Sequence, residues 1–264
     1  MNTVQRGAAD LGERVMETPE SLRGWITEIG HIPTVTDVSA PFTHAPHTAT
    51  TIVLRREPAG ARALVLGPQT RATYTRTDRP AGCTRLRLAP GATRELLGVR
   101  AVDLADRVVP LAELPGPAAD LGPELLELDP AEVLPFLSEV LPRRLTDDPV
   151  RRAHRRLLRR AVASLSTAPT PVPALAAELA VSERQLRNLF IDGVGVSPKH
   201  FARIDRVRTV LAHAGTTPWA ELAGATGYYD QSHLTADFRT LMGVPPAQFV
   251  RGHLPAPTPC RAPG

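Results

Sequence analysis

Two segments near the C-terminal end carry side chains that can hydrogen-bond to nucleic acid, spaced so that each set would share one face of a helix. In the first segment these are Arg184, Arg187 and Asn188, with Glu183 beside them. Arginine and asparagine can pair with the edges of purine bases, and arginine also contacts phosphates. The second segment offers a more neutral set on the same plan: Gln231, Ser232, Thr235 and Arg239. These residue types indicate binding to a major groove.

The two segments are copies of one another. A block that starts at Leu186 is repeated from Leu234, at a constant offset of 48 residues and without a gap. The matched pairs are Leu186 and Leu234, Phe190 and Phe238, Gly195 and Gly243, Val196 and Val244, Pro198 and Pro246, and Phe201 and Phe249. Each copy follows a short helical stretch and a tight turn, so the pattern predicts a doubled helix-turn-helix.

The first unit is expected to begin with a short helix over 174–180, followed by a turn at Val181. Ser182 and Gln185 fit a capping box, so a second helix should start at Glu183 and end at the glycines 193 and 195. Its inner face carries Leu186, Leu189 and Phe190. Ser197 should then cap a longer helix, 198–213, with a buried stripe of Phe201, Ile204, Val207 and Leu211.

The second unit is expected to repeat this plan with one more residue in its turn. Thr217 should cap a helix that starts at Pro218 and turns Trp219 and Leu222 inward, and residues 227–229 should form the turn. Asp230 should cap the second helix, whose inner face carries Leu234, Phe238 and Leu241. His233 falls at the third helical position. Pro245 stands where the first copy has its hydroxyl cap, which weakens the start of the last helix.

From about Leu145 to Arg251 the chain resembles the AraC family of bacterial transcription regulators. The resemblance rests on residues 182–190 (Ser-Glu-Arg-Gln-Leu-Arg-Asn-Leu-Phe), 195–198 (Gly-Val-Ser-Pro), Arg206, 227–228 (Gly-Tyr) and 230–234 (Asp-Gln-Ser-His-Leu). It implies seven helices in two helix-turn-helix subdomains, joined by the helix 198–213. The two recognition helices would enter successive major grooves on one face of a duplex.

Carried over from the family, the base-facing positions are Arg184, Arg187 and Asn188 in the first unit and Gln231, Ser232 and Thr235 in the second. Gln185, His233 and Arg239 complete the expected DNA-binding set. Two positions before Phe238, where the family often has a basic residue, this chain has Ala236, which cannot bind a base or a phosphate in that way. The first unit is therefore expected to contribute more to sequence recognition.

Charge is divided between the two halves of the chain. Residues 143–264 hold 17 Lys and Arg against 9 Asp and Glu, whereas residues 1–142 hold 14 against 18. The net positive charge of the C-terminal half therefore favours binding to a polyanion such as DNA. An arginine run at 151–160, on a helix expected to be capped near Thr146, either contacts phosphate or simply solvates the helix. The phosphate contacts proposed are Arg152, Arg156, Ser182 and Lys199.

The length of 264 residues and the 42% apolar content favour two domains in an α+β chain. We expect a small β-rich domain at 1–142, an all-α double helix-turn-helix domain at 143–252, and a disordered proline-rich tail at 253–264. No stretch of 18 apolar residues and no signal segment occurs, so a cytoplasmic location is expected and a membrane is not. The two cysteines, Cys83 and Cys260, fall in different parts of the chain, which fits a reducing compartment.

In the N-terminal half, short strands are expected at 48–55, 63–66, 72–76 and 84–88, with helices at 91–98 and 129–141. The segments 88–99 and 105–111 resemble a small β-rich domain found ahead of AraC-type domains, which implies a sensor or dimerisation role. His31, His44 and His47 are interpreted as surface or turn residues, with a metal site as the weaker alternative. Cys83 is interpreted as a buried small hydrophobe rather than a redox or alkyl-accepting thiol. Trp25 either lines a pocket or belongs to a core.

The sequence thus favours a DNA-binding transcription regulator without enzyme activity, catalytic residues, metal or cofactor. Its partners would be double-stranded operator DNA, a small-molecule effector, a second copy of the chain and, for an activator, RNA polymerase. The alternative is a DNA-binding repair or alkyl-transfer enzyme that uses Cys83.

Overall fold

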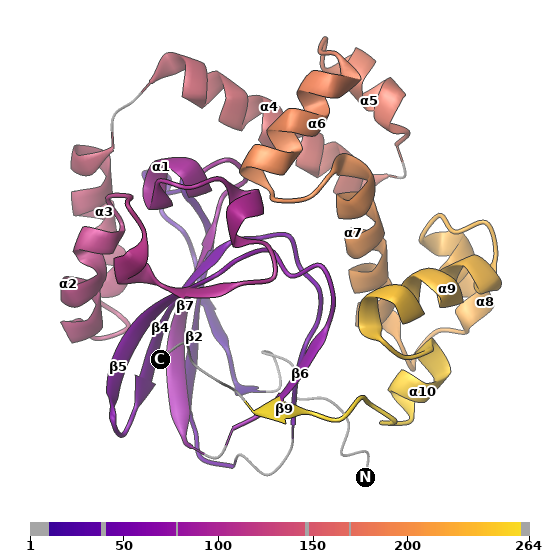
Figure 1. The fold of residues 1–264 in the computed structure, drawn as a ribbon, viewed down its shortest axis with the longest axis horizontal. Helices are drawn as coiled ribbons and strands as arrows, with labels where there is room; N and C mark the ends of the chain where they lie inside the picture. Colours follow the sequence, from indigo (N-terminus) through magenta and orange to yellow (C-terminus); the bar gives the residue numbers. More distant parts are fainter. Residues whose placement is uncertain (1–10, 38–40, 78, 146–147, 169, 260–264) are drawn as a thin grey trace.

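The N-terminal half is built on an antiparallel sheet. The computed structural model describes residues 11–37, 41–77, 79–145, 148–168 and 170–259. Within them the larger sheet has the strand order β1-β2-β7-β4-β5-β8. Its strands are β1 (Arg14–Met16), β2 (Ile26–Val35), β4 (Thr51–Glu57), β5 (Gly60–Leu66), β7 (Ala81–Leu88) and β8 (Val108–Pro110) (Figure 1).

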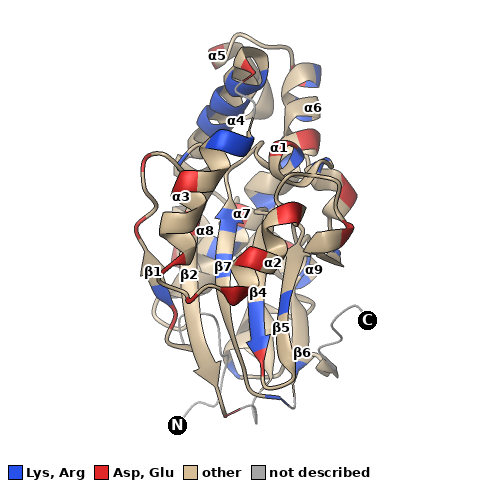
Figure 2. Ribbon diagram, turned by 90° about the vertical axis from the view of Figure 1, so that its left-hand side faces the viewer, with Lys and Arg blue, Asp and Glu red and all other residues tan. Residues whose placement is uncertain are grey.

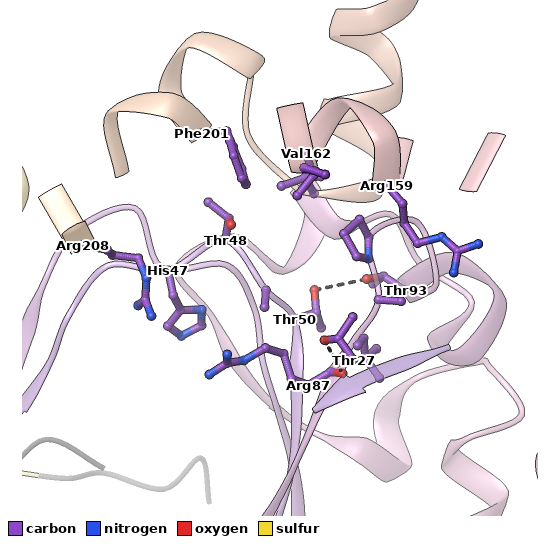
Figure 3. Close-up of a pocket in the computed structure, with 17 residues that line it drawn as sticks. Thr27, His47, Thr48, Thr50, Arg87, Thr93, Arg159, Val162, Phe201 and Arg208 are labelled. Atoms are coloured by element: carbon purple, nitrogen blue, oxygen red, sulfur yellow. Dashed lines mark hydrogen bonds between the residues drawn. The ribbon is translucent and has the colours of Figure 1, made fainter. Parts of the chain in front are cut away.

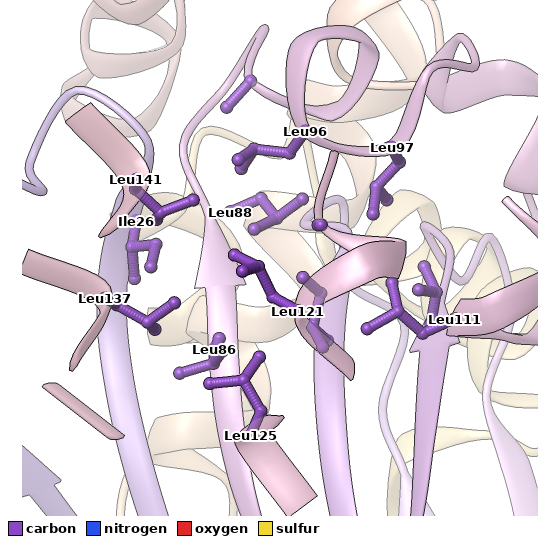
Figure 4. Close-up of a cluster of buried hydrophobic side chains, with 14 of the residues drawn as sticks. Ile26, Leu86, Leu88, Leu96, Leu97, Leu111, Leu121, Leu125, Leu137 and Leu141 are labelled. Atoms are coloured by element: carbon purple, nitrogen blue, oxygen red, sulfur yellow. The ribbon is translucent and has the colours of Figure 1, made fainter. Parts of the chain in front are cut away.

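One face of this sheet carries the main core. β7 alternates strictly, with Leu86 and Leu88 buried on one side and Arg85 and Arg87 on the other. The helices α1 (Thr93–Leu97), α2 (Gly122–Glu127) and α3 (Val133–Arg144), with 3-10 turns at Ala101–Leu104, Leu111–Glu113 and Ala119–Leu121, contribute the opposing side chains. Figure 4 shows these leucines meeting those of the sheet. Trp25 packs against this core.

A second sheet of three strands has the order β3-β6-β9. It joins β3 (Phe42–His44), β6 (Thr73–Arg76) and β9 (Thr258–Pro259), the last paired parallel to β6. The prediction of a disordered tail is therefore wrong for residues 253–259, because Thr258 pairs with Thr75 and Leu254 packs against the core of the second helical unit. Residues 260–264 of that prediction, including Cys260, lie outside the described residues.

The C-terminal half contains the seven expected helices in its described part. They are α4 (Pro149–Thr167), α5 (Val172–Glu178), α6 (Glu183–Gly193), α7 (Pro198–His213), α8 (Trp219–Ala225), α9 (Gln231–Met242) and α10 (Pro246–Val250). α5 and α6 form the first helix-turn-helix, and α8 and α9 form the second, with α7 between them (Figure 1). Each unit has its own core. The predicted α+β fold is confirmed.

Several local predictions are corrected. The first turn contains Ala180, at φ +53°, rather than being centred on Val181. Val210 takes the buried place expected for Leu211. Thr217 does not cap α8, where Pro218 occupies the N-cap without a side-chain hydrogen bond. The boundary placed after residue 142 falls inside α3, and α4 begins after Asp148, whose carboxylate accepts a hydrogen bond from the Val150 N–H. Thr146 lies outside the described residues.

The first helical unit is docked tightly on the β-rich half. The Gly91 N–H donates to the Gly193 carbonyl at 2.9 Å. A Cβ atom on Gly195 would lie 2.8 Å from the Pro68 ring and 2.9 Å from the Ala101 carbonyl oxygen. Such distances leave no room for a side chain, so glycine at 195 permits the contact. Among the described helices, none combines the length and apolar character needed to cross a membrane.

Candidate nucleic-acid interface

The start of α6 is held by a complete capping box. The Gln185 N–H donates to the Ser182 hydroxyl at 3.1 Å, and the Ser182 N–H donates to the Gln185 amide oxygen at 2.9 Å. The predicted cap is therefore confirmed. It also engages two of the proposed DNA contacts, since the Ser182 hydroxyl and the Gln185 oxygen both take part in the cap. The amide NH2 of Gln185 is the group that this arrangement leaves for DNA.

The outer face of α6 presents Arg184, Arg187 and Asn188, which are all exposed. Its inner face is fixed by Leu186 and Phe190, both fully buried, with the Phe190 and Phe201 rings edge to face at 5.7 Å. Within the described residues neither arginine forms an ion pair, so both guanidinium groups can meet an external acceptor. This face therefore presents two guanidinium groups and the amide of Asn188, which can hydrogen-bond to base edges or phosphates.

α9 presents the second set. The Asp230 carboxylate accepts a hydrogen bond from the His233 N–H at 2.8 Å and so caps the helix, as predicted. Gln231, Ser232 and Arg239 are exposed, as is Ala236, whereas Thr235 is half-buried. The exposed His233 ring packs edge-on against Tyr228, with centroids 5.2 Å apart. Apart from Arg239 in the last turn, the outer face of α9 is neutral, and Thr235 is less accessible than expected.

A buried carboxylate that was not among the expected functional residues, that of Asp237, locks α9 to α7. Two nitrogens of Arg203 donate to one Asp237 oxygen, at 3.1 and 2.8 Å, and Arg206 lies 3.7 Å from the other oxygen. The Arg206 guanidinium also lies over the Tyr228 ring, 4.8 Å from its centroid. The signal was present in the sequence, because Asp237 falls three residues after Leu234 on the inner face of its helix. This cluster sets the orientation of the second recognition helix.

The arginine run on α4 divides into two groups. Arg152 and Arg156 are exposed, and Figure 2 shows basic residues along this helix. Arg155, by contrast, is buried against the β-rich half, where it pairs with Glu95 and lies 4.0 Å from the centroid of the Trp25 ring. Arg159 donates to the Arg23 carbonyl at 3.3 Å. The exposed members, and the exposed Lys199 at the start of α7, keep the geometry for phosphate contact.

The sequence makes a metal site of His31, His44 and His47 the weaker alternative for these histidines. Within the described residues no group of three His, Cys, Asp or Glu side chains is arranged to hold a metal ion. His31 and His44 each contact a threonine hydroxyl, at 3.3 and 3.0 Å. Burial, together with the charge of Arg208, lowers the pKa of His47 to about 4. His47 is thus partly enclosed rather than a surface residue, as Figure 3 also shows.

His47 lines a cavity of about 360 Å³ between the β-rich half and the first helical unit. The side chains around it are shown in Figure 3. Arg87 pairs with Glu28 at 3.1 Å, Arg208 donates to the Pro46 carbonyl at 3.2 Å, and Thr93 donates to the Thr50 hydroxyl at 3.2 Å. The cavity is also lined by Arg159, so its charged lining is basic. An anion with some apolar surface fits this lining.

A larger cavity of about 470 Å³ lies in the β-rich half itself. Its lining is largely aliphatic on the strands of the large sheet and bears hydroxyls on β6. Cys83 faces this cavity and is half-buried, whereas a buried side chain was expected. Burial raises the pKa of its thiol. The side chains around it include Ile32, Phe42, Val53, Leu64, Thr73, Thr75, Cys83 and Thr258, together with Arg55, Arg79, Arg85 and Arg107.

Two exposed recognition faces on a doubled helix-turn-helix define a DNA-binding protein. Residues 175–252 match a family model described as a helix-turn-helix domain. This domain is of AraC type, which confirms the resemblance drawn from residues 182–234 for this part of the chain and supports a DNA-binding transcription regulator.

Solved structures similar to this chain include a domain of a response regulator, a DNA-binding domain in complex with DNA, and ToxT. The C-terminal domain of AraT from Geobacillus stearothermophilus is 24% identical over 38% of this chain and 88% of that chain, with a TM-score of 0.35. The DNA-binding domain of AdpA in complex with a target DNA is 24% identical over 38% and 91%, with a TM-score of 0.34. ToxT from Vibrio cholerae is 12% identical over 90% and 97%, with a TM-score of 0.42. No match was found among curated proteins.

Proposed function

We propose that this chain binds a specific operator in double-stranded DNA through α6 and α9 and regulates transcription in response to a small molecule held by its N-terminal half. The observation that carries the proposal is the pair of exposed polar faces, each on a capped helix whose opposite side is buried in its own core. A rigid helix with hydrogen-bonding side chains on one face is the element that enters a major groove.

The base contacts are assigned mainly to Arg187, Arg184 and Asn188, with Gln231 and Ser232 reading the second groove. Gln185, His233, Thr235 and Arg239 stand at the margins of these faces. Phosphate contacts are assigned to Arg152, Arg156 and Lys199, with Ser182 contributing through the cap. Because α6 presents two arginine guanidinium groups and the exposed start of α9 presents only neutral side chains, the first unit contributes more of the affinity for DNA.

The effector site is assigned to the cavity of the β-rich half, because aliphatic side chains such as Val53 and Leu64 cover its wall on the large sheet, while threonine hydroxyls and four arginines at its margins can orient a ligand. This chemistry fits a small, largely apolar molecule. The interdomain cavity is the competing site and calls for an anion. In a reporter strain, Val53→Phe should abolish the response if the first cavity holds the effector, whereas Arg208→Gln should do so if the second does.

A second copy of the chain and RNA polymerase complete the proposed partners, and the cytoplasm is the proposed location. The enzyme alternative depends on Cys83. An alkyl or redox acceptor reacts as a thiolate, and burial acts against that form by raising the pKa of this thiol. The structure therefore favours regulation over alkyl transfer.

The direct test is selection from a pool of random DNA duplexes with the full chain. A selected site should bind at least about a thousandfold more tightly than bulk DNA, as is typical of specific recognition. Arg187→Ala should relax preference at one base pair. If no sequence is enriched, or if binding to all duplexes is equal, the proposal is wrong.

A further inference from the structure

Strand β6 is shared by the ligand cavity and the second DNA-binding unit. Because side chains alternate along a strand, Thr73 and Thr75 face the cavity while Tyr74 points the other way. Tyr74 is 6% exposed and lies in the core of the second unit, with Leu234 and Phe238 of α9 in the same cluster. One short strand thus has a ligand-facing side and a side buried in the recognition unit.

The contact between β6 and α9 is polar as well as apolar. The Tyr74 hydroxyl donates to the Met242 carbonyl at 2.7 Å, and the Ala72 N–H donates to the Leu241 carbonyl at 2.7 Å. Both carbonyls belong to the last turn of α9, where helical carbonyls have no partner within the helix. The β-rich half therefore completes the hydrogen bonding of the second recognition helix.

The C-terminal segment fastens the same two parts together a second time. After α10, Leu254 packs against the core of the second unit, and Thr258 then pairs with Thr75 of β6. The Thr258 hydroxyl donates to the Tyr74 carbonyl at 3.3 Å, and Thr258 also lines the cavity. Figure 1 shows β9 beside β6 after the chain has left α10. The segment 253–259 is thus a strap from the DNA-binding unit to the cavity wall.

We propose that β6 and this strap couple the cavity to the second recognition helix, so that a ligand that orders β6 stabilises the docked position of α9. The inference rests on the proposed function, in which the cavity takes the effector and α9 contacts DNA. The coupling is reciprocal: if the ligand stabilises the docked position of α9, then any event that favours this position of α9 also raises the affinity for the ligand by the same factor. The first unit is docked elsewhere, through Gly91 and Gly193, and stays outside this coupling.

The test is amide hydrogen exchange, followed by mass spectrometry, on the full chain without DNA or ligand. Tyr74→Phe removes one hydroxyl and one hydrogen bond, and it should speed exchange about fivefold both in residues 73–76 and in the last turn of α9. A chain that ends at Gly252 lacks the strap and should show the same two changes. Exchange in α6 should stay within about twofold of the wild-type rate in both variants.

Tyr229→Phe is the matched control, because Tyr229 is 93% exposed and loses the same hydroxyl without any contact to β6. The proposal is overturned if exchange rises in β6 while the end of α9 keeps its wild-type rate. It is equally overturned if α6 and α9 loosen to the same extent, which would indicate general destabilisation.

A second measurement separates this inference from the proposed function. A duplex selected by the wild-type chain should alter exchange in residues 73–76 at least about twofold, and this response should disappear in Tyr74→Phe. An unchanged β6 on DNA binding refutes the coupling and leaves the regulator function standing. If the chain selects no duplex, the proposed function fails, while the exchange comparison of the DNA-free variants still decides whether β6 and α9 are coupled.

Discussion

Arg155 is expected to stabilise the docking of the two halves of the protein rather than to bind DNA. Its side chain and that of Glu95 are each 7% exposed, and their ion pair joins α4 to α1. The guanidinium also covers the face of Trp25 at 4.0 Å. Breaking a buried ion pair by removing one partner costs about 3–5 kcal/mol, because the other charge is left buried without compensation. Arg155→Met should lower the free energy of unfolding by this amount.

Thermal and urea unfolding measure this effect directly. In a chain of this size, each kcal/mol shifts the midpoint by about 2–4 °C, so a fall on the order of 10 °C is expected. Arg156→Met is the matched control, since Arg156 is exposed and its removal should change stability by no more than about 0.5 kcal/mol. The slope of DNA affinity against salt should not respond to Arg155→Met.

A double-mutant cycle checks that the pair itself is responsible. In a Glu95→Gln background the buried negative charge is gone, so Arg155→Met should cost at least about 1.5 kcal/mol less than in the wild type. Additive losses would refute the reasoning and would assign the effect to packing on Trp25. Equal losses for Arg155→Met and Arg156→Met would show that Arg155 is solvated in the protein.

Three further predictions concern DNA affinity and pH. Arg187→Ala should cost about 1–3 kcal/mol at a selected site, and Gln231→Ala should cost less; an equal or larger effect at Gln231 in a binding titration would reverse the proposed ranking of the two units. Changing Arg152 and Arg156 to Gln together should weaken specific and bulk binding alike and reduce the log–log salt slope by about 0.9 for each phosphate that is no longer neutralised, whereas an unchanged slope would make them solvating residues. The pKa of His47 is lowered to about 4 in the folded protein, so between about pH 6.5 and pH 4 the imidazole is protonated only in the unfolded chain. The contribution of His47 to stability is therefore complete above about pH 6.5 and is lost as the pH falls to about 4. His47→Gln should flatten this part of a profile of unfolding free energy against pH.

The helical half could be predicted closely because its signals are local. Ser182 with Gln185, Ser197 with Pro198, and Asp230 each mark a helix start within four residues, and the structure places α6, α7 and α9 at those starts. Caps act through hydrogen bonds to their own first turn, so no distant partner is needed to identify them.

The β-rich half could be predicted only in part. The strands expected at 48–55 and 84–88 correspond to β4 and β7, with bounds that differ by up to three residues, but β2 was missed, although it is ten residues long. β2 contains Gly30 and Pro33 and is irregular in register against β7, which lies more than 40 residues away. Likewise, nothing in the run 151–160 distinguishes Arg155 from its neighbours, because Glu95 is 60 residues distant in the chain. Burial of that kind depends on tertiary contacts.

The duplication itself hides a difference between its two copies. Gly195 and Gly243 are equivalent by sequence, and both have positive φ, at +86° and +77°. Gly243 caps the C-terminus of α9, and a Cβ atom there would meet only the Pro255 ring at 3.6 Å. A Cβ atom on Gly195 would collide with Pro68 and Ala101 of the β-rich half. The same residue thus ends a helix in one unit and permits docking in the other. Because the first unit is held by this backbone contact and the second by Tyr74 and the strap, a signal that moves β6 acts on one recognition helix and leaves the other in place.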